Sequence, residues 1–161
     1  MRSEDRLFDV RDRVAIITGA SGGLGERFAR VLHGRGAHVV LAARRPERLD
    51  AIAASLPGSL GIVCDVGLEA DRNRVVTSAL DTFGKLDILV NNAGISGAPV
   101  PAERMPLDRW DRTLSVNLSG LFGMTQAAAQ SMLAAGSGSI INIGSVFGLV
   151  ANAPVTDVAY A

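Results

Sequence analysis

The sequence predicts an α/β fold, a doubly wound parallel sheet with helices on both of its faces. Short apolar runs alternate strictly with longer amphipathic stretches along the 161 residues. The runs are almost continuously apolar, which is typical of parallel strands that are covered on both sides. Because crossovers between parallel strands are right-handed, the stretches between the runs are expected to pack as helices against the sheet.

Five apolar runs are expected to form the strands. They are VAIIT (14–18), HVVLAA (38–43), LGIVCDV (60–66), LDILVNN (86–92) and SIINIG (139–144). Each has the length of an ordinary strand, and most are rich in β-branched residues.

The stretches between these runs are expected to form four helices, at about 24–34, 46–56, 68–83 and 106–136. Pro46 suits the first turn of the second helix, and Gly136 suits the end of the last. We expect the stretches 95–106 and 146–161 to be irregular. The sequence contains no linker or repeat, so a single domain over residues 1–161 is expected.

The composition favours a globular protein, with 48% hydrophobic and 20% charged residues. Sixteen basic residues balance sixteen acidic ones, which offers no electrostatic basis for binding nucleic acid or an anionic membrane. No apolar run approaches the roughly 18 residues of a membrane span. Cys64 is the only cysteine, and His33 and His38 have no metal-ligand company. We therefore expect a cytoplasmic protein that has no metal site and binds neither nucleic acid nor a membrane.

A glycine-rich turn, TGASGGLG (18–25), lies between the first strand and the first helix. Gly19, Gly23 and Gly25 allow a tight turn, close approach of the backbone to a pyrophosphate, and close packing of helix on strand. The N–H groups at the start of the helix favour phosphate. We expect these glycines, with Ser21 and Leu24, to bind a dinucleotide. A turn without a ligand is the alternative, but the flanking strand and helix favour the cofactor.

The spacing of this turn, with CDV (64–66), NNAG (91–94) and the run from Asn117 to Tyr160, resembles the short-chain dehydrogenase/reductase family. Members similar to 3-oxoacyl-ACP reductases are the nearest resemblance. The motifs occur in the family's order and cover almost the whole chain. The resemblance implies a Rossmann-like fold, hydride transfer with a nicotinamide cofactor, and a homo-oligomer in the full-length form.

The end of the second strand bears on the choice of cofactor. In NAD sites an acidic residue there binds the ribose 2′-hydroxyl. Here Ala42 and Ala43 are followed by Arg44 and Arg45. Because a guanidinium can grip a 2′-phosphate with two hydrogen bonds, we predict NADP, with Arg44 as the main contact and Arg45 as support. The alternatives are a solvated arginine pair and NAD.

The resemblance implies further cofactor contacts at the ends of the third and fourth strands. Asp65 and Val66 would border the adenine, although Asp65 could instead cap a helix or turn. Asn91, Ala93 and Gly94 would line the site, with Asn91 and Gly94 nearest the ligand. Thr18 is expected to order the glycine-rich turn.

The resemblance also implies the catalytic residues. Ser145 would hold and polarise the carbonyl oxygen, and Tyr160 would give or take the proton. Asn117 would support a water that links the family's lysine to solvent. The alternative is that none of the three is catalytic, and that they are an ordinary loop serine, surface tyrosine and mid-helix asparagine. Their order after a matching cofactor turn favours catalysis.

The chain departs from the family pattern at its end. The family's lysine belongs four residues after Tyr160, whereas the sequence ends at Ala161. Lys85, the only lysine, cannot substitute, because it lies between the third helix and the fourth strand. We expect the C-terminal part of the fold to be missing, the fifth strand to be an exposed edge, and the parent protein to be the enzyme.

Two functions follow. The first is an NADP-dependent carbonyl reductase or secondary-alcohol dehydrogenase that acts on a small molecule. The second is a nucleotide-binding fragment whose catalysis is impaired without the lysine. Another Rossmann-like enzyme, such as a methyltransferase, explains neither NNAG nor the Ser145–Tyr160 pair.

Overall fold

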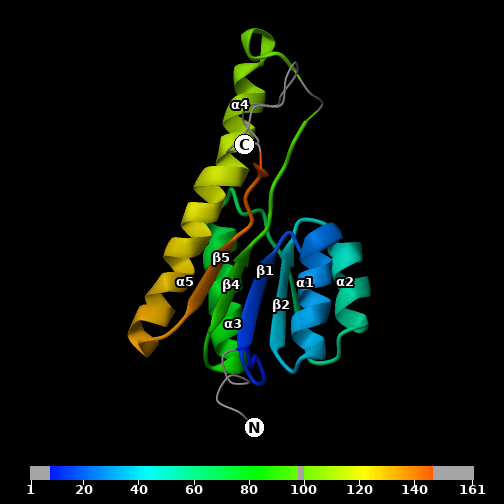
Figure 1. The fold of residues 1–161 in the computed structure, drawn as a ribbon, viewed down its shortest axis with the longest axis vertical. Coiled ribbons are helices and arrows are strands. Elements are labelled where there is room, and N and C mark those ends of the chain that lie inside the picture. Colours follow the sequence, from blue (N-terminus) through cyan, green and yellow to red (C-terminus); the bar gives the residue numbers. More distant parts are fainter. Residues whose placement is uncertain (1–7, 98–99, 147–161) are drawn as a thin grey trace.

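A five-stranded parallel sheet forms the centre of the molecule (Figure 1). The structure is a computed structural model and describes residues 8–97 and 100–146. The strands are β1 (Val14–Thr18), β2 (His38–Ala43), β3 (Leu60–Val63), β4 (Ile88–Asn91) and β5 (Ser139–Asn142). Their order is β3-β2-β1-β4-β5, and every neighbouring pair is parallel. The predicted α/β fold is confirmed.

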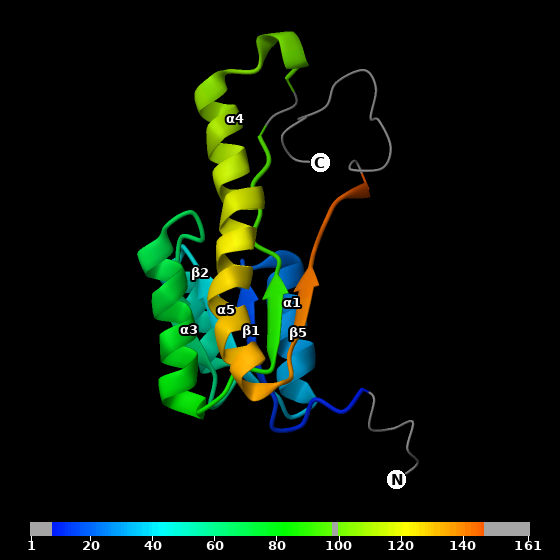
Figure 2. The ribbon, with the colours of Figure 1, turned by 90° about the vertical axis from the view of Figure 1, so that its left-hand side faces the viewer.

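Helices cover both faces of this sheet (Figure 2). They are α1 (Gly23–Gly34), α2 (Pro46–Ala54), α3 (Glu69–Phe83), α4 (Leu107–Leu114) and α5 (Leu121–Ala135). Successive side chains of β1 enter different cores, as the pleat requires. Ile17 packs in the core that holds Ala29 of α1 and Leu49 of α2. Ile16 packs in the core that holds Val75 of α3 and Met124 of α5. The doubly wound arrangement therefore has one apolar core on each side.

The predicted long helix at 106–136 is interrupted by a π-helical stretch. Residues Ser115–Gly120, called the π segment below, separate α4 from α5, and the two helices follow one another along a single long rod (Figure 1). Short π stretches of this kind frequently occur at functional sites. A short 3₁₀ helix, Ala102–Arg104, also lies in the stretch that was predicted to be irregular.

Several strands are shorter than the apolar runs that predict them. β3 ends at Val63 because the chain turns immediately afterwards: the Asp65 carboxylate accepts the Gly67 N–H, 2.9 Å. β4 begins at Ile88, and the carboxylate of Asp87 accepts the Val14 N–H, 2.9 Å. Backbone pairing nevertheless reaches one residue past each bound: the Cys64 N–H donates to the Ala43 carbonyl, 2.9 Å, and the Asp87 N–H donates to the Val14 carbonyl, 3.0 Å.

Within the described residues, β5 is the last strand of the sheet and pairs only with β4. Ile141 of β5, on the face of the sheet that α1 covers, is 46% exposed. Across residues 8–97 and 100–146, no helix is long and apolar enough to cross a membrane.

Candidate cofactor site

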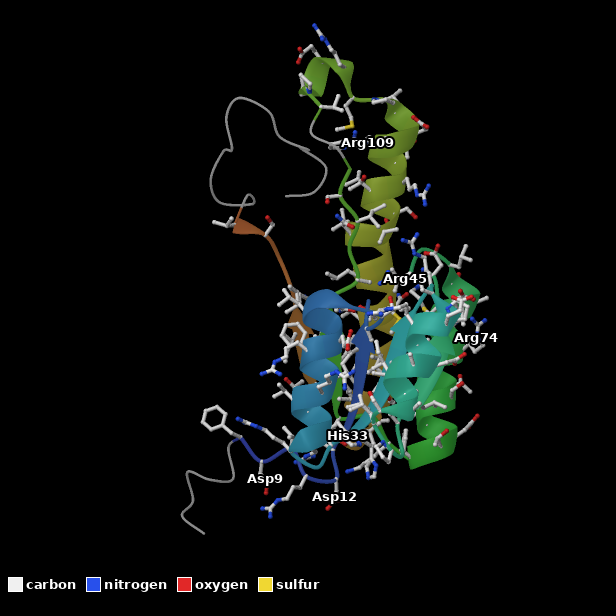
Figure 3. All side chains as sticks on the ribbon, turned by 90° about the vertical axis from the view of Figure 1, so that its right-hand side faces the viewer. Asp9, Asp12, His33, Arg45, Arg74 and Arg109 are labelled. Atoms are coloured by element: carbon white, nitrogen blue, oxygen red, sulfur yellow. The ribbon has the colours of Figure 1, made fainter. Side chains whose placement is uncertain are left out.

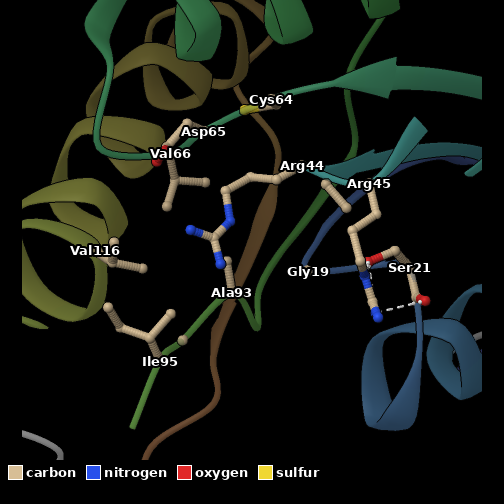
Figure 4. A pocket seen from close by; sticks show the side chains of 12 residues that line it. Gly19, Ser21, Arg44, Arg45, Cys64, Asp65, Val66, Ala93, Ile95 and Val116 are labelled. Carbon is tan, nitrogen blue, oxygen red and sulfur yellow. Dashed lines mark hydrogen bonds between the residues drawn. The ribbon is translucent and has the colours of Figure 1, made fainter. Parts of the chain in front are cut away.

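A pocket of about 220 Å³ lies where the carboxyl ends of β1, β2, β3 and β4 meet (Figure 4). Ligands of open α/β sheets bind at this edge. Arg45 marks it in Figure 3, whereas Asp9, Asp12 and His33 lie at the opposite end of the sheet. The lining residues are Gly19, Ser21, Ala43, Arg44, Arg45, Cys64, Asp65, Val66, Ala93, Gly94, Ile95 and Val116.

The glycine-rich turn is packed too tightly for side chains at two positions. Gly19 has a φ of +67°, and a Cβ there would lie 2.9 Å from the Cα of Ala93. A Cβ on Gly25 would collide with the Gly19 carbonyl oxygen and lie 2.6 Å from Asn92 Nδ2. Gly23 opens α1, and its neighbour Leu24 is 61% exposed. Of the predicted turn residues, Gly19 and Ser21 line the pocket, whereas Gly23, Leu24 and Gly25 do not.

Thr18 ties this turn to the end of β4. Its buried hydroxyl donates to the Val90 carbonyl, 3.3 Å, and accepts the N–H groups of Asn92 and Ala93, both at 3.0 Å. The Asn92 side chain donates back to the Thr18 carbonyl, 3.0 Å. Thr18 orders the turn, as expected, and Ala93 and Gly94 are brought to the pocket.

The two arginines after β2 point in different directions. Arg44 extends into the pocket between Val66 and Ala93 (Figure 4). The Arg45 guanidinium instead donates to Ser21, with Nη2 2.9 Å from the carbonyl oxygen and Nε 3.2 Å from the hydroxyl. Arg45 was expected to support a phosphate contact. In the structure its hydrogen bonds hold the glycine-rich turn at Ser21. Arg45 is also the N-cap residue of α2, without a side-chain cap hydrogen bond.

Asp65 and Val66 form the wall of the pocket opposite the turn. Asp65 lines the pocket and also closes a tight turn, so its turn role is observed and its contact with an adenine stays a prediction. Its own N–H donates to Asp71, 2.8 Å, and this hydrogen bond holds the pKa of the Asp71 carboxyl below its ordinary value. Burial raises the pKa of the neighbouring Cys64 thiol to about 11, so this thiol is neutral at pH 7.

Asn91 departs from expectation. It was expected among the residues nearest the ligand, but its side chain does not line the pocket. The side chain is buried and donates to Thr125 of α5, 2.9 Å, and to Asn142 of β5, 3.0 Å. Because successive residues of a strand face opposite sides, Asn91 faces α5 while Asn92 faces the glycine-rich turn. Asn91 therefore joins β4, β5 and α5.

Asn117 lies in the π segment and binds the chain beyond β4. Its Oδ1 accepts the Ile95 N–H, 2.8 Å, and its Nδ2 donates to the Ile95 carbonyl, 3.0 Å. These two hydrogen bonds fix Ile95, which lines the pocket beside Val116. Asn117 thus acts on the pocket through the backbone of another residue.

Comparison with known proteins identifies the chain. The family model described as short chain dehydrogenase matches residues 13–161. The chain belongs to the short-chain dehydrogenase family. The family is one of oxidoreductases that use NAD or NADP as cofactor.

Individual relatives agree with this assignment. D-threitol dehydrogenase of Mycolicibacterium smegmatis is 39% identical over 153 residues, which are 92% of this chain and 58% of the relative. NAD-dependent glycerol dehydrogenase of Listeria innocua is 34% identical over 148 residues, 91% of this chain and 58% of the relative. A solved short-chain type dehydrogenase/reductase from Mycobacterium marinum has a TM-score of 0.92 at 34% identity. That match covers 99% of this chain and 66% of the solved chain.

The catalytic residues expected in a short-chain dehydrogenase are only partly placed. Ser145 lies three residues beyond β5 and is half-buried. Tyr160 lies outside the described residues. Lys85 forms an ion pair with Asp87, 3.2 Å, between α3 and β4, as its place in the sequence predicted. The structure therefore brings Gly19, Ser21, Arg44, Arg45, Asp65, Val66, Ala93 and Gly94 to one pocket, while their binding of a cofactor and the expectations for Ser145 and Tyr160 stay predictions.

Sequence reasoning missed four residues that line the pocket. Ala43 is the last residue of β2 and Cys64 directly follows β3, so the strand-end rule would have found them. Ile95 and Val116 carry no such pattern. Their place depends on the π segment, which brings Val116 next to the backbone that Asn117 holds.

Proposed function

We propose that this chain forms a single NADP-binding domain of an oxidoreductase that interconverts a secondary alcohol and a carbonyl compound by hydride transfer. One observation carries the cofactor preference. Arg44 extends into the pocket, and the strand before it ends in alanines, so no carboxylate stands where NAD sites place one. A guanidinium in that place favours a 2′-phosphate.

The pocket suits each part of such a cofactor. Gly19 lies so close to Ala93 that no side chain fits there, and its backbone is bare. A pyrophosphate would lie against this backbone, at the start of α1. Val66, Ile95 and Val116 offer apolar surface for an adenine ring. When bound, the cofactor supplies the hydride chemistry, and the protein positions it.

For catalysis we propose the roles that the family resemblance implies. Ser145 holds the substrate oxygen by a hydrogen bond, and Tyr160 gives or takes the proton at that oxygen. A free tyrosine has a pKa near 10, so a neighbouring positive charge is needed to favour the tyrosinate at neutral pH. Asn117 contributes by holding Ile95, a lining residue, through two hydrogen bonds.

The substrate proposed is a small alcohol or carbonyl compound. Relatives named for D-threitol and glycerol support an alcohol. We further propose a cytoplasmic homo-oligomer. Leu118 and Phe122, which are 60% and 63% exposed one turn apart on the long helix, support association through that helix.

Titration of the purified chain with NADPH and NADH, followed by fluorescence, tests the cofactor proposal. NADPH should bind more tightly, and Arg44→Ala should weaken NADPH about tenfold or more, because a charge-assisted hydrogen bond is lost. Arg35→Ala is the matched control, since Arg35 caps the far end of α1.

Each outcome of this titration separates the alternatives. A preference for NADH would overturn the role of Arg44 and keep the family. Failure to bind either nucleotide would overturn the proposed site. Tight NADPH binding without hydride transfer to any carbonyl in a full-length protein would instead favour the nucleotide-binding alternative.

A further inference from the structure

The wall formed by Val66 belongs to a loop rather than to a strand. β3 ends at Val63, and the loop 64–68 continues to α3 with Cys64, Asp65 and Val66 all on the pocket (Figure 4). Val66 is only 6% exposed. Backbone pairing holds this loop to β2 at Cys64, whose N–H donates to the Ala43 carbonyl at 2.9 Å. At Val66, contacts from other elements add to that pairing.

Arg72 of α3 provides one of these contacts. Its Nη1 donates to the Val66 carbonyl at 2.7 Å. The guanidinium lies directly against the backbone of α5, where a Cβ on Gly123 would collide with Nε and lie 2.9 Å from Nη2. Arg72 can therefore reach Val66 along this path only because residue 123 has no side chain.

A second glycine of the long helix touches the same wall. A Cβ on Gly120 would lie 2.9 Å from both Cγ2 and the carbonyl oxygen of Val66. The π segment that ends at Gly120 also carries Val116, on the pocket, and Asn117, which holds Ile95. One helix thus supports two lining residues, Val66 and Ile95.

We propose that Arg72, seated on Gly123, is a positioning residue of the cofactor site: it holds Val66 in place and so sets the shape of the adenine end of the pocket. This inference rests on the proposed binding of an adenine nucleotide there. It predicts that loss of Arg72 weakens binding of the adenosine half of the cofactor. Binding should weaken although Arg72 itself does not line the pocket.

The chain offers a matched control two residues further along α3. Arg74 makes the same kind of hydrogen bond, with Nη2 2.7 Å from the Val63 carbonyl, and also pairs with Asp71 at 2.8 Å. Val63 lies on the same chain segment but does not line the pocket. A purely structural role of Arg72 would make the two arginines equivalent for ligand binding.

The experiment measures binding of 2′,5′-ADP and of 5′-AMP by isothermal titration calorimetry, with the melting temperature as a check on folding. Arg72→Met should weaken the tighter of the two nucleotides about tenfold, as expected for losing a hydrogen bond from a charged donor. Arg72→Lys retains a donor and should recover most of the affinity. Arg74→Met should weaken binding clearly less than Arg72→Met, since Arg74 donates to Val63, which does not line the pocket, and reaches the lining residue Asp65 only through Asp71.

Gly123→Ala should displace the Arg72 guanidinium from the Val66 carbonyl without changing the charge of the chain. It should weaken nucleotide binding in the same way, and the double variant with Arg72→Met should bind no worse than the weaker single variant. Such non-additivity is the mark of two residues that act through one contact.

Two results would overturn the inference. If the wild type binds nucleotide and Arg72→Met binds as tightly as Arg74→Met, the positioning role is wrong and the proposed function stands. If the wild type binds neither nucleotide, the proposed function and the inference built on it both fail.

Discussion

Adding one methyl group to Gly25 is predicted to damage both the fold and the cofactor site. In Gly25→Ala the new Cβ would collide with the carbonyl oxygen of Gly19 and lie 2.6 Å from Asn92 Nδ2. The asparagine could rotate, but the carbonyl belongs to the backbone of the turn and cannot. The turn or the start of α1 must therefore shift. Overpacking of this kind costs about 1–3 kcal/mol of the free energy of unfolding.

The same helix contains the control for this experiment. Gly34 is the last residue of α1, and a Cβ there would meet nothing within 4 Å. Because alanine favours the helix over glycine, Gly34→Ala should be neutral or stabilise by up to about 1 kcal/mol. The two substitutions add the same methyl group to the same helix and should change stability in opposite directions.

Thermal unfolding and NADPH titration measure the result. A loss of about 2 kcal/mol in Gly25→Ala should lower Tm by about 4–8 °C for a chain of this size. NADPH affinity should fall about tenfold or more, since the displaced turn is the proposed pyrophosphate cradle. The reasoning is refuted if Gly25→Ala unfolds and binds like the wild type while Gly34→Ala behaves as described.

Three other substitutions or modifications have expected outcomes. Asp87→Asn should lower stability by about 1–2 kcal/mol at pH 7 in urea unfolding, because the carboxylate accepts the Val14 N–H. Burial would raise the pKa of Asp87, but this hydrogen bond and neighbouring cations hold it below its ordinary value. The stabilisation by the Asp87 carboxylate is therefore full above about pH 4 and is lost as the pH falls through its pKa in the folded state. In Asp87→Asn the free energy of unfolding should depend less on pH in this acid range. The Cys64 thiol, with its pKa raised to about 11 by burial, should resist iodoacetamide at pH 8 until urea unfolds the chain, which mass spectrometry would detect. Asn117→Ala should lower Tm and NADPH affinity together, since both hydrogen bonds to Ile95 are lost, and an unchanged affinity would count against its supporting role.

The fold could be predicted from sequence because its information is local. Apolar period and length identify each strand, and β1 and β2 agree with the expected bounds at both ends. The glycine-rich turn can be recognised from its spacing, although the crowding that requires Gly19 comes from Asn92 and Ala93, far away in sequence at the end of β4. Residue spacing therefore identified part of the pocket lining, such as Gly19 and Ser21, but not Ile95 or Val116.

The π segment could not be predicted in this way. Residues 106–136 have an ordinary helical pattern, and nothing in it marks the wider turn at Ser115–Gly120. The reason for that turn is tertiary: Gly120 meets Val66, and Asn117 meets Ile95, from parts of the chain far away in sequence. Contacts of this kind decide which residues support the pocket, and single-sequence patterns do not record them.

Neighbouring residues of the same type point in different directions at this site, and the geometry of strands explains why. Arg44 enters the pocket while Arg45 binds Ser21. Asn92 faces the glycine-rich turn while Asn91 faces α5. Successive side chains at the end of a strand point to opposite faces, so a doubled residue places one copy on each side of the sheet. A pair of like residues at a strand end should therefore be assigned two roles from the outset, and only the three-dimensional structure decides which copy takes which role.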